Sequence, residues 1–231
     1  MTGFPAATTV SEAMTSRRSI RAFTDRPVNP AMLRAIMETA QRAPSGGNVQ
    51  PWMVSIVTGD ALTDLIAKVG ERLAMGPAGS QMEYQIYPDP TPDPWMARRY
   101  GVAYAMYDAM GIERQDKIGR AMAMAQNFRG FGAPVMLFVH CPRFMGPPQW
   151  ADMGIWLQSV MLLCREAGLD TCPQEAWANF GLTVRECLGL GEEQILYTGL
   201  AIGWRDAEAA VNNFAVDRAS LDEVVNWHGF D

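Results

Sequence analysis

One segment of this chain constrains its fold more than any other, because it is apolar on every side. Residues 149–167 are expected to form a helix, and large apolar side chains surround nearly its whole circumference. They are Met153, Ile155, Trp156, Leu157, Val160, Met161, Leu162 and Leu163. A helix without a polar face is buried on all sides. We therefore expect this helix inside a single domain, 1–231, whose length suits one substantial core.

Capping signals mark the starts of four more helices. A Thr followed three residues later by Glu has the spacing of a capping box, in which each side chain accepts from the other residue's backbone N–H. Asn and Asp are also favoured N-cap residues, and Pro is favoured in the first turn. The signals are Thr9 with Glu12, Asn29 with Pro30, Asp60, and Thr183 with Glu186.

Apolar patterns complete the expected secondary structure. Residues 96–110 and 114–128 have helical patterns, whereas 133–139 is a continuous apolar run typical of a fully buried strand. Two further runs, 52–58 and 195–202, also predict strands, and we expect the first of them to be buried. The chain thus combines a few strands with many helices.

Two segments fit neither pattern. Residues 76–95 contain five prolines and two glycines and carry several aromatic side chains, which predicts a long loop. This loop is either a lid over a ligand pocket or a surface excursion that contacts a partner subunit. Residues 204–231 lack apolar periodicity, so we expect an arm that packs on another surface.

The composition excludes several classes of function. Asp and Glu number 25 against 19 Lys and Arg, and no long basic run is present, so a nucleic-acid partner is not expected. The N-terminus lacks a targeting pattern and the apolar runs are too short to cross a bilayer, so we expect a cytoplasmic protein without membrane association. Four cysteines without a Cys-x-x-Cys pair, and two distant histidines, predict free thiols and no metal site.

Two short motifs near the N-terminus carry the functional signal. The first is RRSIR at residues 17–21, whose arginines and serine offer the planar donor forks and the hydroxyl that suit phosphate oxygens. The second is APSGGNVQPW at residues 43–52, a tight turn in which glycines let the backbone approach a flat ligand. We therefore expect a small phosphorylated ligand.

In their order and spacing, with a helix between them, the two motifs resemble those of the FMN-dependent nitroreductase family. The resemblance extends from residue 17 to residue 218, and it is strongest to the nitrobenzoate and nitroaromatic reductase branch. It implies an α+β, nitroreductase-like fold with a central, mainly antiparallel sheet flanked by helices. It also implies a homodimer in which a C-terminal strand is exchanged between the subunits.

The resemblance further implies which residues bind FMN. The first motif would hold the phosphate and the ribityl chain, and the second would contact the flavin across the subunit interface. Backbone N–H groups near Glu175 and Ala176 would bind the reactive edge of the ring. Arg218 would return to the phosphate, and Asn127 would lie at the ribityl chain, although a helix-terminal polar residue explains Asn127 equally well. The full set is Arg17, Arg18, Ser19, Arg21, Pro44, Ser45, Gly46, Asn48, Gln50, Asn127, Pro173, Gln174, Glu175, Ala176, Gly203, Trp204 and Arg218.

The reaction implied is a two-electron, ping-pong transfer from NAD(P)H through FMN to a nitroaromatic substrate, giving nitroso and hydroxylamine products. The flavin carries the redox chemistry, so no catalytic side chain is expected, and Cys172 has no His base nearby in the sequence. A separate nicotinamide-binding motif is absent. Two alternatives remain open: a flavoenzyme of the same fold acting on quinones, enones or haloaromatics, and a non-catalytic flavin-binding protein.

Overall fold

A four-stranded sheet lies at the centre of the computed structural model, which describes residues 5–230. The strands are β1 (Met53–Thr58), β2 (Val135–Pro142), β3 (Asp170–Gln174) and β4 (Gln194–Gly203). They follow the order β1-β2-β4-β3, and all neighbouring strands are antiparallel. β1 and β3 are therefore the edge strands, and the outer side of β3 forms an isolated parallel bridge between Thr171 and Ser19.

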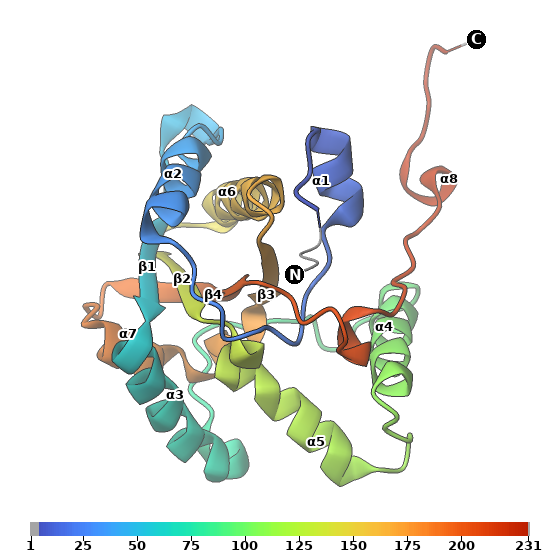
Figure 1. Ribbon diagram of the computed structural model, residues 1–231. Helices are drawn as coiled ribbons and strands as arrows, with labels where there is room; N and C mark the ends of the chain where they lie inside the picture. The colour runs from blue at the N-terminus through green and yellow to red at the C-terminus, as the bar shows by residue number, and fades with distance from the viewer. Residues whose placement is uncertain (1–4, 231) are drawn as a thin grey trace.

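Helices and short 3-10 turns surround the sheet on both faces (Figure 1). The helices are α1 (Val10–Ser16), α2 (Pro30–Ala40), α3 (Gly59–Ala74), α4 (Trp95–Ala109), α5 (Lys117–Ala125), α6 (Pro147–Glu166), α7 (Gly181–Leu188) and α8 (Leu221–Val224). The 3-10 turns are η1 (Gly46–Asn48), η2 (Gly76–Gly79), η3 (Gln126–Gly132), η4 (Glu175–Phe180) and η5 (Ala210–Asn212). In the described chain, no helix is both long and apolar enough to span a membrane.

The sheet separates two apolar cores. α2 and α6 pack on one face, and α3 and α7 pack on the other. In β2, Leu137 and Val139 join the first core and Met136 and Phe138 join the second, because successive side chains of a strand point to opposite faces. The predicted fully buried strand at 133–139 is thus confirmed as β2.

Two of the four capping predictions are confirmed. At the start of α1, Thr9 and Glu12 form both bonds of the capping box, and Asn29 Oδ1 accepts from the Ala31 N–H at the start of α2. Asp60 instead lies inside the first turn of α3, because the chain already turns at Gly59, whose φ is +59°.

The second predicted capping box is also wrong. α7 begins at Gly181, and Thr183 lies within its first turn. The N–H and the hydroxyl of Thr183 both donate to Gln81 Oε1, at 3.1 and 2.6 Å. A contact from a distant loop therefore satisfies the groups that a local cap would have satisfied.

Burial also differs from expectation at two elements. α6 is not buried on all sides, because Ile155 on its outer face is 44% exposed. β1 is not a buried strand either, since Met53 and Ile56 are 44% and 43% exposed at the edge of the sheet. The predicted helix at 114–128 is shorter than expected: α5 ends at Ala125, and the chain continues as η3.

Candidate flavin site

The arginine motif is held against the free edge of β3. Ser19 forms a parallel bridge with Thr171, and the Ile20 N–H donates to the Thr171 carbonyl at 3.0 Å. Ile20 is fully buried and anchors the segment, while the Arg21 N–H donates to Asn212 Oδ1 at 2.8 Å. Arg21 Nη1 donates to the Ser19 carbonyl at 3.2 Å, and the other guanidinium N–H groups of the motif make no hydrogen bond in the described chain, so they remain available to a ligand.

These guanidinium groups have no carboxylate partner. Within residues 5–230, none of Arg17, Arg18, Arg21 and Arg218 forms an ion pair. Burial lowers the pKa of Arg17, and the like charge of Arg218 lowers it further, so Arg218 lies within electrostatic reach of Arg17. A partly buried cluster of like charges favours a bound anion, and the planar forks of arginine match phosphate oxygens.

A buried charge network fixes β3 beside this cluster. The Asp170 carboxylate accepts from Arg205 Nε at 2.7 Å and from Arg165 Nη1 at 3.2 Å, and all three side chains are buried. Arg165 also donates to Ser16 Oγ at 3.3 Å, immediately before the arginine motif. Charge-assisted hydrogen bonds thus join the ends of α1 and α6 to the start of β3.

A cavity of about 930 Å³ opens beside β3, and its wall includes Arg21, Asn127 and residues 173–176. Gln174 Nε2 donates to the Asn127 carbonyl at 2.7 Å, whereas Gln174 Oε1 is buried without a hydrogen-bond partner in the described chain. Burial raises the pKa of Glu175. An unsatisfied acceptor on the same wall as an anion-binding arginine fits a ligand with hydroxyl donors and a phosphate, as FMN has.

Most of the remaining cavity wall comes from the long loop and from α4 with its C-cap residue, and α5, η3, η4 and η5 supply the other residues. The wall residues from these two segments are Met82, Gln85, Ile86, Tyr87, Pro88, Asp89, Met96, Arg99, Val102, Ala103, Met106 and Met110. The first part of the loop is pinned to the core, because Gln81 binds Thr183 and the Tyr84 hydroxyl donates to the Tyr197 carbonyl. The loop at 76–95 therefore does border a cavity, and its action as a lid stays a prediction.

The turn at residues 44–50 lies elsewhere on the chain. The Gly46 N–H donates to the Asp152 carboxylate at 3.2 Å, and Ser45 Oγ accepts from the Gln50 N–H at 2.9 Å. Pro44, Gly46, Asn48 and Gln50 are exposed, Ser45 is partly buried, and no residue of 44–50 lines the cavity in the part of the chain that the structure describes. α6 lies between α1, which leads into the arginine motif, and α2, which leads into this turn (Figure 1). A single chain therefore does not bring the two motifs together.

Gly203 and Trp204 likewise lie outside the cavity wall defined by residues 5–230. A Cβ at Gly203 would lie 2.7 Å from Pro134 Cδ, so close packing requires glycine there. The Trp204 ring stacks under the Arg26 guanidinium at 3.7 Å. In this structure both residues serve packing, and their contact with the cofactor stays a prediction.

Cys172 is buried next to the arginine motif. Burial raises the pKa of its thiol to about 11, although Arg21 and Arg17 act in the opposite direction. A buried thiol that stays protonated is a poor nucleophile. This environment agrees with the expectation that Cys172 is not catalytic.

Comparison with known proteins decides the family. The model of the nitroreductase family matches residues 14–204. The chain belongs to the nitroreductase family. It is 33% identical to the chloronitrobenzene nitroreductase of Comamonas testosteroni, over 96% of this chain and 98% of that protein.

Solved nitroreductase structures have the same fold. The FMN- and NADPH-dependent nitroreductase NfnB from Sphigopyxis sp. strain HMH matches with a TM-score of 0.95 and 59% identity, over 96% of this chain and 100% of that one. The FMN-dependent NfnB from Mycobacterium smegmatis, solved in complex with NADPH, matches with a TM-score of 0.89 and 29% identity, over 94% and 97%. The predicted α+β nitroreductase-like fold is confirmed.

Proposed function

We propose that this nitroreductase-family chain binds FMN and uses NAD(P)H to reduce nitroaromatic compounds. The observation that carries the proposal is the arginine cluster at the edge of β3, which has no carboxylate partner within residues 5–230 and lies beside the cavity that residues 173–176 line. Relatives of nearly the same length that are named nitroreductases support it. When bound, FMN accepts two electrons from NAD(P)H and passes them to the substrate.

The chain's own residues bind and orient the reactants. Arg17, Arg21 and Arg218, with Ser19, would hold the phosphate through charge-assisted hydrogen bonds. The Gln174 amide, oriented by its bond to the Asn127 carbonyl, would face the ribityl hydroxyls. Backbone N–H groups near residues 175 and 176 would donate to the reactive edge of the ring, as the resemblance implies.

The overall reaction needs no protein nucleophile. A nitro group, NAD(P)H and a proton give a nitroso group, NAD(P)⁺ and water; a second NAD(P)H and proton convert the nitroso group into a hydroxylamine. The cavity of about 930 Å³ is large enough for a flat cofactor and an aromatic ring beside it. Because no second nicotinamide site is expected, NAD(P)H and the substrate would bind there in turn.

A homodimer would complete this site. The turn at 44–50 is exposed and separate from the cavity of its own chain, so a second copy is needed to bring such a turn to the flavin. Exposed apolar residues support a large interface, because they include Met53, Ile56 and Ile155 on β1 and α6. We also infer a cytoplasmic location, since the four cysteines are free thiols.

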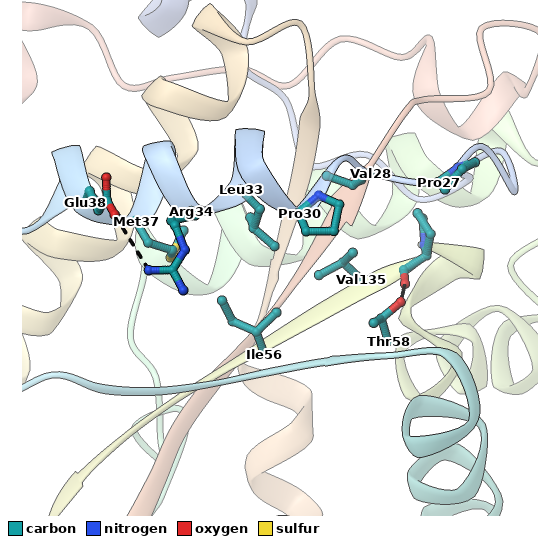
Figure 2. A pocket seen from close by; sticks show the side chains of 11 residues that line it. Pro27, Val28, Pro30, Leu33, Arg34, Met37, Glu38, Ile56, Thr58 and Val135 are labelled. Atoms are coloured by element: carbon teal, nitrogen blue, oxygen red, sulfur yellow. Dashed lines mark hydrogen bonds and ion pairs between the residues drawn. The ribbon is translucent and has the colours of Figure 1, made fainter.

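The edge of β1 offers a place for the arm of the second copy. A groove of about 520 Å³ lies there, and Figure 2 shows Leu33 and Met37 of α2 facing Ile56 of β1 and Val135 of β2. The C-terminal arm carries apolar side chains that its own chain leaves exposed. They are Leu221, Val224, Trp227 and Phe230, which are 58%, 61%, 60% and 77% exposed. If the arm of the second copy packed in this groove, both the groove and the apolar side chains of the arm would be covered.

The dimer is tested by removing the arm. Deletion of residues 213–231 should convert a stable dimer into a monomer and weaken FMN binding, because Arg218 is lost with the arm. Sedimentation at low micromolar concentration, with FMN absorbance followed in the same cell, measures both effects. A wild-type protein that sediments as an FMN-bound monomer contradicts the proposal.

The activity is tested with a substrate panel. The purified protein should carry one FMN per chain, released by acid and identified by chromatography. Steady-state kinetics with NADPH or NADH and nitrobenzene, 4-nitrobenzoate and dinitro compounds should give parallel double-reciprocal lines. If quinones, enones or halophenols are reduced but no nitro compound is, the result supports a flavoenzyme of the same fold with other chemistry. If neither NADH nor NADPH reduces the bound flavin, the result supports a non-catalytic flavin-binding protein.

A further inference from the structure

α4 presents one face to the cavity, and that face is apolar except at one position. Met96, Val102, Ala103 and Met106 recur at the spacing that places side chains on one side of a helix, and all of them line the cavity. Arg99 lies in the same stripe, one turn from its neighbours on either side. A single charge in an apolar wall determines which ligands fit and how they are oriented.

The surroundings of Arg99 leave its donors available. Its guanidinium stacks on the Tyr87 ring, 3.8 Å from the ring centroid, and Tyr87 also lines the cavity. This cation–π contact does not use the N–H donors, and Arg99 makes no hydrogen bond in the described chain. Two carboxylates share the cavity wall, Asp89 and Glu175, and in the described chain neither forms an ion pair with Arg99.

The neighbouring arginine provides a natural contrast. Arg98 donates to Glu223 Oε2 at 2.8 Å and is not among the cavity-lining residues of the described chain. The two arginines are adjacent in the sequence and carry the same charge. They differ in what they face, because Arg98 has a carboxylate partner and Arg99 faces the cavity.

We propose that Arg99 binds an anionic group on the molecule that reacts with the flavin. The inference rests on the proposed function, in which Arg17, Arg21 and Arg218 already serve the cofactor phosphate. Two sources share the required chemistry, since a carboxylate on the aromatic substrate and the 2′-phosphate of NADPH both present oxygens that match a guanidinium fork. The cavity would thus favour ligands that carry a negative charge near its α4 wall, in addition to selecting them by ring shape.

The test compares charged and neutral partners in Arg99→Gln, with Arg98→Gln as the matched control. If the group is a substrate carboxylate, Arg99→Gln raises the KM for 4-nitrobenzoate about tenfold and leaves nitrobenzene unchanged. If it is the nicotinamide phosphate, the KM for NADPH rises about tenfold and that for NADH does not. FMN content and the flavin spectrum should match the wild type, and added salt should reduce the wild-type preference for the charged partner.

Direct binding keeps this test separate from the test of activity. Titration of the oxidised holoenzyme with 4-nitrobenzoate, or with NADP⁺, followed by the flavin difference spectrum, measures the affinity without turnover. About tenfold weaker binding of at least one anion in Arg99→Gln supports the inference even if no nitro compound is reduced, an outcome that would reject the proposed function alone. Equal affinities in wild type and Arg99→Gln for both anions, or the same loss in Arg98→Gln, overturn the inference.

Discussion

The two walls of the cavity are built in different ways. The β3 wall is fixed by backbone bonds to the arginine motif and by the buried Asp170 network. The α4 wall has no buried residue, and its one charged side chain, Arg99, contacts the ring of Tyr87. A rigid wall suits a cofactor that is the same in every turnover, whereas an adaptable wall rich in Met suits substrates that vary.

The largest expected effect tests the rigidity of the β3 wall. Asp170→Asn removes the buried carboxylate that binds both Arg165 and Arg205, so the free energy of unfolding should fall by about 3–5 kcal/mol. Urea unfolding measures the change. The control is Glu38→Gln, which breaks the exposed pair with Arg34 and should cost less than about 0.5 kcal/mol. A loss below about 1 kcal/mol in Asp170→Asn would show that the network does not hold this wall.

The next effect concerns cofactor affinity. Arg17→Ala should weaken FMN binding by about 1.5–3 kcal/mol, because it removes a charge-assisted bond to the phosphate from a half-buried position. Fluorescence titration of the apoprotein with FMN gives the dissociation constant. Arg72→Ala, a change of the same type on α3 that lies outside both the cavity and the groove, should have no effect. An unchanged affinity in Arg17→Ala would remove this residue from the site.

A smaller effect should appear at the α4 wall. Met106→Ala enlarges the cavity and should change the KM values of nitro compounds by about threefold to tenfold, with larger rings gaining most. FMN affinity should stay the same, and stability should fall by less than about 1 kcal/mol, since no residue of α4 is buried. Loss of FMN from this variant would show that α4 belongs to the cofactor wall, and the comparison of the two walls would fail.

The smallest expected effect is a pH dependence of the free energy of unfolding, caused by His140 in the sheet. Burial lowers the pKa of His140, whose Nδ1 lies 3.2 Å from Gln194 Oε1. As pH falls below about 6.5, the unfolded chain takes up this proton before the folded chain does, so stability decreases with acid, by at most about 1.4 kcal/mol per pH unit. Urea midpoints between pH 7.5 and about 5.5 should fall less in His140→Gln than in wild type. Parallel pH profiles of the two proteins would exclude His140 as the cause.

The sequence was informative where a signal is local. The continuous apolar run of β2, the capping box of α1 and the Asn29 N-cap of α2 depend on residues close together in the chain, and the structure confirms them. The arginine motif was identified from its own chemistry and residues 173–176 from the family resemblance, and the structure places both beside the cavity. A local motif and a resemblance together therefore predicted much of the β3 wall.

Distant contacts could not be predicted in the same way. No short motif links Arg205 to Asp170, and the sequence of α4 does not show that Arg99 faces a cavity whereas Arg98 pairs with Glu223. Apolar periodicity shows that one face of a helix or strand is buried in a contact. It does not show whether that contact is made by the same chain or by a second copy. This ambiguity explains why α6 and β1 were expected to be buried, although Ile155 and Ile56 are exposed.

Anaerobic mixing of the purified, FMN-loaded protein with NADPH tests the central claim most directly. The account predicts that NADPH bleaches the visible flavin absorbance by a full two-electron reduction, and that a nitroaromatic compound added next restores it while a hydroxylamine or nitroso product forms. NADH should be compared in the same experiment. A flavin that NADPH and NADH both leave oxidised, or a reduced flavin that no nitro compound reoxidises, would contradict the account.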